Sequence, residues 1–173
     1  ECSDQDRNQL EKVNDMRFFR DDTTREKIKM LKRIPVFRAL NRRELLVVEE
    51  LLHERTYAKD EIIFGEGDAG HGVYIIVSGK VGLKSSHKLL ESATFEFGPG
   101  DTVGELSLFD EAPQIATAFA LEPTVAVALF RAELSSLLTH NTRIGVKVLL
   151  EISKALSRRA RRLLLQESGT PSV

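Results

Sequence analysis

The sequence predicts a mainly β domain, a double-stranded β-helix or jelly roll with helices before it and one long helix after it. Nine of the eleven glycines lie between Gly65 and Gly104, where they permit the tight turns of short hairpins. Apolar, β-branched and aromatic residues are frequent in the runs between these glycines, and no crossover helix separates consecutive runs, as parallel winding would require. On both sides of this stretch the apolar residues have the spacing of amphipathic helices.

Helices are expected before the strands. The charge-rich stretch 4–33 carries scattered apolar residues and is interrupted at residues 21–24, so that Thr24 is the expected N-cap of a second helix. Asn41 is followed three residues later by Glu44, which is the pattern of a capping box. We expect it to open an amphipathic helix that buries leucine and valine side chains.

Several short segments have the composition of strands. Residues 115–121 and 124–130 are the most apolar of them, and a Glu122-Pro123 turn divides the two. Thr102 and Val103 form a very short strand between two glycine turns. The remaining expected strands are 61–64, 73–78, 80–84 and 94–97.

The C-terminal part, 131–167, is again helical, with a break at Asn141-Thr142. The long helix after the break carries an apolar stripe with two interpretations, packing against the strands or a homodimer seam, and we expect the homodimer. The stripe consists of Leu149, Ile152, Leu156 and Leu163. The expected divisions are a helical segment 1–33, a β-roll 34–140, a dimerisation or lid helix 141–167 and a tail 168–173.

Basic residues crowd the end of this helix. Cations are favoured near a helix C-terminus by its dipole, which is our interpretation of the cluster; a nucleic-acid or anionic-lipid patch is the alternative. No helix-turn-helix unit follows, so no DNA-binding domain is expected in this chain. The cluster contains Lys154, Arg158, Arg159, Arg161 and Arg162.

Composition excludes several classes of protein. The net charge of −1 gives no global field for nucleic acid, and Cys2 alone cannot form an internal disulfide, which suits the reducing cytoplasm. No apolar run approaches the roughly 20 residues of a membrane span. The four histidines are isolated and no nucleophile elbow or phosphate loop is present, so we expect no metal, no cofactor, no catalytic residues and no enzyme activity.

The stretch 97–118 carries the chemistry. Gly98-Pro99-Gly100 is a turn, and Gly104 to Leu108 has the composition of a single helical turn. The free amides at such a start attract a phosphate or carboxylate, and Gly104 would let an anion approach closely. The Glu105 carboxylate can accept hydrogen bonds from ligand hydroxyls.

These motifs, taken in order, resemble the cyclic nucleotide-binding domain family, which includes the bacterial catabolite activator protein and the regulatory subunits of protein kinases. The resemblance covers about residues 31–165 and implies a regulatory domain in signal transduction with cyclic AMP or cyclic GMP as its ligand. The segments that carry it are Ile34–Phe37, Phe64–Asp68, Val73–Val81, Gly100-Asp101 and Gly104–Leu108.

The resemblance also implies the binding residues. Backbone groups around Gly104, Leu106 and Ser107 would face the cyclic phosphate, and Glu105 would hold the ribose 2′-hydroxyl. The full implied set is Val103, Gly104, Glu105, Leu106, Ser107, Gln114 and Ile115.

One position departs from the family pattern. Relatives that bind cyclic nucleotides usually carry a phosphate-pairing arginine after the proline of this segment, and here the residue is Gln114. Leaving a buried ionic group unpaired costs about 3–5 kcal/mol, which corresponds to roughly 100- to 4,000-fold weaker binding. Lys59, Lys84 and Lys88 are candidates for a compensating cation.

The resemblance and this departure together predict a regulatory ligand-sensing domain with weak or altered cyclic nucleotide binding. Two alternatives remain open at this point. One is a ligand-free dimerising interaction scaffold, and the other is a sensor of a different anion such as a cyclic dinucleotide.

Overall fold

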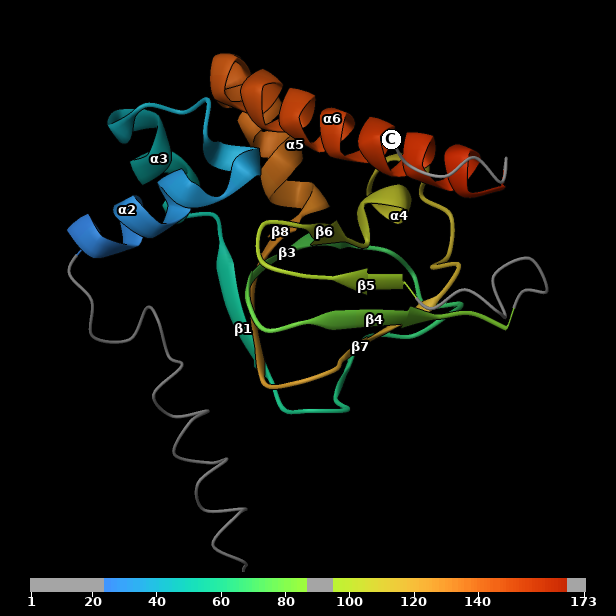
Figure 1. The fold of residues 1–173 in the computed structure, drawn as a ribbon. Coiled ribbons are helices and arrows are strands. Elements are labelled where there is room, and N and C mark those ends of the chain that lie inside the picture. The colour runs from blue at the N-terminus through green and yellow to red at the C-terminus, as the bar shows by residue number, and fades with distance from the viewer. Residues whose placement is uncertain (1–23, 87–94, 168–173) are drawn as a thin grey trace, which may run out of the picture.

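The structure is a computed structural model that describes residues 24–86 and 95–167, apart from the side chains of Glu26, Leu163, Gln166 and Glu167. The helix expected within 4–20 and the tail 168–173 lie outside the described residues. The strands form two four-stranded antiparallel sheets, as the predicted jelly roll requires (Figure 1). The first sheet has the order β1 (His53–Tyr57), β8 (Thr124–Phe130), β3 (Gly72–Ser78) and β6 (Thr102–Val103). The second has the order β2 (Ile62–Phe64), β7 (Thr117–Ala120), β4 (Val81–Lys84) and β5 (Phe95–Phe97).

Helices flank the roll in the predicted places. The short helix α4 lies between β6 and β7, and the other helices precede or follow the strands (Figure 1). The helices are α2 (Thr24–Arg33), the 3₁₀ helix η1 (Pro35–Phe37), α3 (Arg42–Glu49), α4 (Glu105–Asp110), α5 (Arg131–His140) and α6 (Thr142–Glu167).

The predicted capping box at the start of α3 is confirmed. The side-chain oxygen of Asn41 accepts from the amides of Arg43 and Glu44, at 2.9 and 3.0 Å, and the Glu44 carboxylate accepts from the Asn41 amide at 2.8 Å. The same carboxylate accepts from Lys147 Nζ at 2.7 and 2.8 Å. One glutamate therefore both caps α3 and fastens α6 to it.

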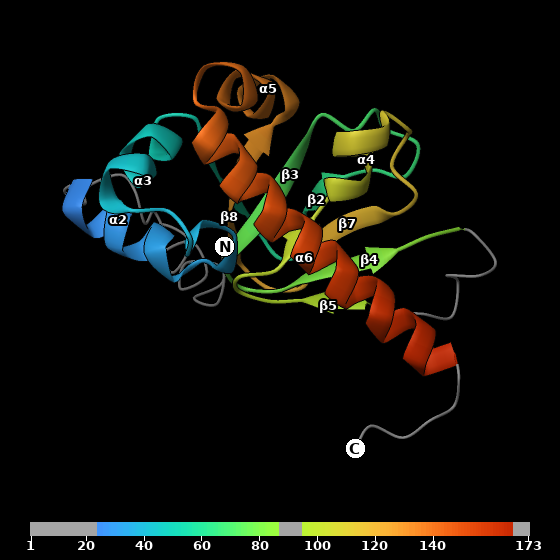
Figure 2. The same cartoon turned by 90° about the horizontal axis from the view of Figure 1, so that it is seen from above.

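The long helix α6 passes over the roll (Figure 2). Its residues Ile144, Val148 and Ile152 are buried in the main core together with Ile28 and Leu31 of α2. Spacings of four residues place these three side chains on one face of the helix. The predicted divisions after residues 33 and 140 place α2 and α6 in segments separate from the β-roll. In the structure both helices share one hydrophobic core with the roll.

Two predictions of secondary structure need correction. Strand β1, His53–Tyr57, was missed because His-Glu-Arg-Thr-Tyr lacks an apolar alternation; the strand lies at the edge of its sheet and is half exposed. The strand predicted from Ile115 begins only at Thr117, because Ile115 stands at an exposed position before the ladder.

Candidate functional site

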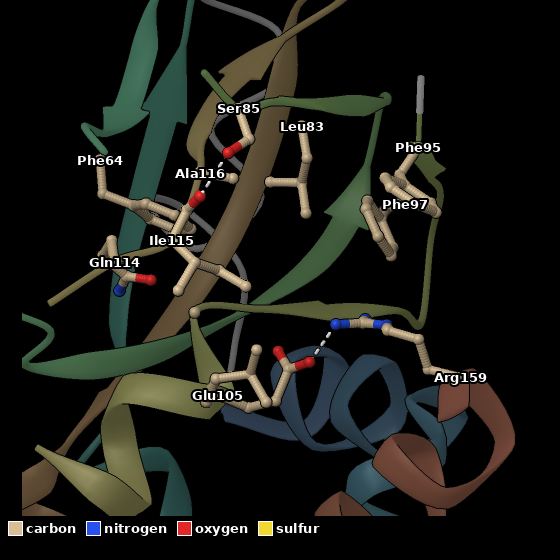
Figure 3. Close-up of a pocket in the computed structure, with 12 residues that line it drawn as sticks. Phe64, Leu83, Ser85, Phe95, Phe97, Glu105, Gln114, Ile115, Ala116 and Arg159 are labelled. Atoms are coloured by element: carbon tan, nitrogen blue, oxygen red, sulfur yellow. Dashed lines mark hydrogen bonds and ion pairs between the residues drawn. The ribbon is translucent and has the colours of Figure 1, made fainter. Parts of the chain in front are cut away.

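A cavity of about 120 Å³ lies between the second sheet, α4 and α6 (Figure 3). Its walls are mainly apolar, and three phenylalanines, Phe64, Phe95 and Phe97, contribute to them. The polar side chains in the wall belong to Ser85, Glu105, Gln114 and Arg159. The rest of the wall is formed by the apolar side chains of Leu83, Leu106, Ile115 and Ala116 and by the backbone of Gly104. A site with apolar walls and a few converging polar groups is typical of small-molecule binding.

Gly104 shapes the floor of this cavity. The residue precedes α4 with a φ of 83°, in the left-handed region that glycine adopts readily. A Cβ at this position would lie 2.9 Å from the Gly72 carbonyl oxygen and 3.3 Å from Phe64 Cε1. The α4 helix can therefore start here, with Glu105 turned inward, only if the residue before it is glycine.

The carboxylate of Glu105 is buried, with 1% of the residue exposed. Arg159 Nη1 of α6 donates to Glu105 Oε1 (Figure 3). Nη2 of the same guanidinium donates to the Thr102 carbonyl oxygen. The same guanidinium lies over the Phe97 ring, with Cζ 4.5 Å from the ring centroid, a cation–π contact. Arg159 therefore connects the second half of α6 to the start of α4 across the cavity.

The second oxygen of this carboxylate, Glu105 Oε2, is buried and has no hydrogen-bond partner among the described residues. Burial raises the pKa of the Glu105 carboxyl, and the positive charge of Arg159 partly offsets the effect. An unsatisfied buried acceptor is unfavourable, and a ligand hydroxyl in the cavity would satisfy it. Glu105 Oε2 is therefore a strong hydrogen-bond acceptor that suits an uncharged donor group of a ligand, such as a hydroxyl.

Gln114 lies at the other side of the cavity from Arg159 (Figure 3). Its backbone is fixed, because its N–H donates to the Asp68 carbonyl at 2.9 Å and its carbonyl accepts from the Gly67 amide at 2.8 Å. The residue is 7% exposed, and its side-chain amide forms no hydrogen bond within residues 24–86 and 95–167. Next to it Ile115 is 54% exposed and borders the opening. Among the described residues that line the cavity, none on this side is positively charged.

Comparison with known proteins identifies the family of the chain. Residues 54–141 match the sequence pattern of the cyclic nucleotide-binding domain, which is about half of the chain. The chain belongs to the cyclic nucleotide-binding domain family. The "Cyclic AMP receptor protein" of Thermus thermophilus is 36% identical over 109 residues, which are 62% of this chain and 50% of that protein. The chain thus spans about half the length of this relative.

Solved structures agree with the predicted fold. A cyclic nucleotide-binding domain from Methylobacillus flagellatus superposes with a TM-score of 0.74 at 22% identity, over 86% of this chain and 87% of that one. The catabolite activator protein of Thermus thermophilus superposes with a TM-score of 0.66 at 33% identity, over 78% of this chain and 62% of that one. The resemblance and the jelly-roll fold inferred from the sequence are both confirmed.

Five of the seven binding residues predicted for this cyclic nucleotide-binding domain line the cavity; they are Gly104, Glu105, Leu106, Gln114 and Ile115. The other two do not. Val103 is fully buried in the core, and the Ser107 side chain is directed at Gly70, where an added Cβ would lie 1.9 Å from Ser107 Cβ. The Ser107 carbonyl is occupied by Arg131 Nη2 at 2.6 Å.

Arg159 was not predicted as a site residue, because it was grouped with its neighbours as a cation near the helix end. The helical spacing of the apolar residues could have predicted that the Arg159 side chain faces the roll. Arg159 continues the buried face of Ile144, Val148 and Ile152 along α6, whereas Arg158 and Arg162 are exposed. Lys59 and Lys84, considered as compensating cations, do not line the cavity, and Lys88 lies outside the described residues.

The predicted dimer stripe of α6 divides between core and surface. Ile152 is fully buried in the core of its own chain, and Leu156 packs against that core, so the packing interpretation holds for both. Leu149 is half-buried, and the side chain of Leu163 is outside the description. The large apolar side chains that α6 exposes are instead Val146, Leu150, Leu164 and Leu165.

Two features are absent from the described residues, 24–86 and 95–167. Neither α6 nor any other described helix is both long and apolar enough to cross a bilayer. No group of three or more histidine, cysteine, aspartate and glutamate side chains in this part of the chain is arranged to hold a metal ion.

Proposed function

We propose that the chain is a regulatory ligand-sensing domain that binds cyclic nucleotides weakly, because a neutral Gln114 faces the place where the phosphate would be bound. The position of this buried amide in the cavity wall is the observation on which the proposal depends. A glutamine can donate one neutral hydrogen bond, whereas a guanidinium would donate two charge-assisted bonds of about twice the strength.

The rest of the cavity favours a ligand with hydroxyl groups and a flat ring. The free oxygen Glu105 Oε2 can accept from a ribose hydroxyl, and the rings of Phe95 and Phe97 offer an apolar surface to a base. Arg159 is already engaged by Glu105 and by the Thr102 carbonyl, which makes it a poor substitute for the missing phosphate partner.

A route for signalling follows from the contacts of Arg159. A ligand hydroxyl on Glu105 alters the carboxylate to which the guanidinium is bound, and the guanidinium belongs to α6. Ligand binding would then bias the position of α6 between two arrangements, as differential contacts can. We further propose that α6 forms a homodimer through its exposed apolar residues, of which Val146 and Leu150 lie in its first half.

Calorimetry with cyclic AMP, cyclic GMP and adenosine tests the ligand. We expect high-micromolar affinity at best for the two cyclic nucleotides. Because the phosphate has no guanidinium partner, adenosine should bind within about tenfold of cyclic AMP. Sub-micromolar binding of a cyclic nucleotide would contradict the proposal.

The exposed apolar side chains of α6 favour the interaction scaffold as a second candidate. A scaffold would gain no thermal stability from any nucleotide, including a cyclic dinucleotide, and its dimer would form without ligand. Sedimentation of the wild type and of Leu150→Glu, with and without cyclic AMP, separates the two. A ligand-dependent change in association supports the sensor, and a dimer that forms without ligand and is unaffected by it supports the scaffold.

A further inference from the structure

A second cleft lies on the outer side of Arg159. It has a volume of about 330 Å³ and is bounded by η1, by the turn between β5 and β6, and by α6. Four arginines line it: Arg38, Arg158, Arg159 and Arg162. Among the described residues that line it, Asp101 alone is acidic, so cations dominate the described part of its walls.

The four arginines differ in their partners. Arg38 Nε lies 3.2 Å from Glu151 Oε2, and Arg159 is paired with Glu105. Arg158 and Arg162 are exposed and form no ion pair with any residue of the described parts of the chain. The cleft thus contains two guanidinium groups without a carboxylate at pairing distance, on one helix and four residues apart.

The opposite wall is a fixed turn. The Gly100 amide donates to the Ile76 carbonyl at 2.8 Å, and the Gly98 amide donates to Asp101 Oδ2 at 3.0 Å. Gly100 has a φ of 91°, and a Cβ there would lie 2.9 Å from Pro35 Cδ. The turn is therefore held against η1, and Asp101 is engaged within the turn itself.

We propose that this cleft is a second binding site, for a small phosphate-bearing anion, in which Arg158 and Arg162 hold the phosphate. Guanidinium groups present several donors in a planar fork that matches phosphate oxygens. A concave site with fixed walls and more cations than anions suits a small polyanion better than an exposed helix face does. The phosphate can come from free pyrophosphate or from a nucleotide, because both present the same oxygens.

The test is calorimetric titration of the full chain with pyrophosphate, ATP and adenosine at constant ionic strength. Pyrophosphate and ATP should bind and should shift the amide NMR signals of Gly100 and Asp101. Tighter binding of ATP would indicate a nucleotide as the source of the phosphate, and equal binding would indicate phosphate alone. Millimolar pyrophosphate that leaves both amide signals unchanged, or adenosine that shifts them as strongly as ATP, would overturn the proposal.

Matched variants locate the site. Arg158→Gln combined with Arg162→Gln should weaken pyrophosphate binding at least about tenfold, since two charge-assisted contacts are lost. The control combines Arg143→Gln with Arg161→Gln, which removes the same charge from exposed positions of α6 outside the cleft. The control should change affinity less than about twofold. Equal losses in the two double variants would show general attraction by the helix and would refute a site in the cleft.

Discussion

Arg159 of α6 donates a hydrogen bond to the buried carboxylate of Glu105, 54 residues earlier in the chain. Glu105 begins α4 beside the cavity, whereas Arg159 lies in the second half of the last described helix. A buried charge is tolerated only when it is paired, so this contact holds the inward position of Glu105 and the second half of α6 together. The second carboxylate oxygen, Glu105 Oε2, is buried and has no hydrogen-bond partner among the described residues.

Gly104→Ala should destabilise the domain and distort the cavity floor. The substitution places a Cβ at a positive φ and 2.9 Å from the Gly72 carbonyl oxygen, and we expect a loss of about 1–3 kcal/mol in the free energy of unfolding. Chemical denaturation of the variant and the wild type measures this loss in the free energy of unfolding. Gly98→Ala is the control, because a Cβ there meets nothing within 4 Å and its φ is not positive. Equal stability of the two variants would contradict the steric role of Gly104.

Glu105→Gln should reveal the raised pKa of Glu105 in the pH dependence of stability. The folded state holds the Glu105 proton more tightly than the unfolded state, whose ordinary pKa is 4.5. The wild type must therefore lose stability relative to Glu105→Gln as the pH rises from 4.5 through the raised pKa, and the difference should then level off. Urea unfolding of both proteins across this range measures the difference. A difference that moves in the opposite direction would show that the ion pair with Arg159 outweighs burial.

Much of the fold could be predicted because local signals agreed with the final structure. The glycine turns, the capping box at Asn41 and the break before Thr142 all lie where the sequence places them. Strand β1 could not be found, because its residues gain their pairing from β8, more than sixty positions later in the chain. Long-range pairing of this kind leaves no local pattern.

The site was predicted in part for the same reason. Gly104, Glu105 and Gln114 belong to one contiguous stretch with recognisable motifs, and all three line the cavity. Arg159 comes from another segment, and only the packing of α6 over the roll brings it there. Ile152 shows the opposite kind of error. Its spacing along the helix fits a dimer seam as well as a core position, but its side chain is buried in the core of its own chain.

Lys147→Met should weaken the attachment of α6 to α3. The hydrogen bond from Lys147 is the main reason that the pKa of Glu44 is lowered, so this contribution to stability is present above the ordinary pKa of 4.5. The variant should unfold at lower temperature than the wild type at neutral pH. The deficit should shrink as the pH falls through the lowered pKa of Glu44, where the carboxylate becomes protonated.

Arg143→Met is the matched control for this prediction. Its guanidinium approaches the same carboxylate only to 3.9 Å and its side chain is 85% exposed, so its removal should have little effect. Thermal unfolding at several pH values compares the two variants. A deficit for Lys147→Met that does not change with pH would show that the lysine stabilises by packing rather than by its charge.

The binding of cyclic AMP to Gln114→Arg, measured by calorimetry, tests most directly whether a cation is missing from the cavity. Gln114→Met, which is similar in length but uncharged, is the control and should bind no more tightly than the wild type. The arginine should tighten binding at least about tenfold, because it adds charge-assisted hydrogen bonds to a phosphate that otherwise has no cationic partner. Unchanged affinity for Gln114→Arg, in a protein as stable as the wild type, would contradict the assignment of Gln114 to the phosphate side of the site.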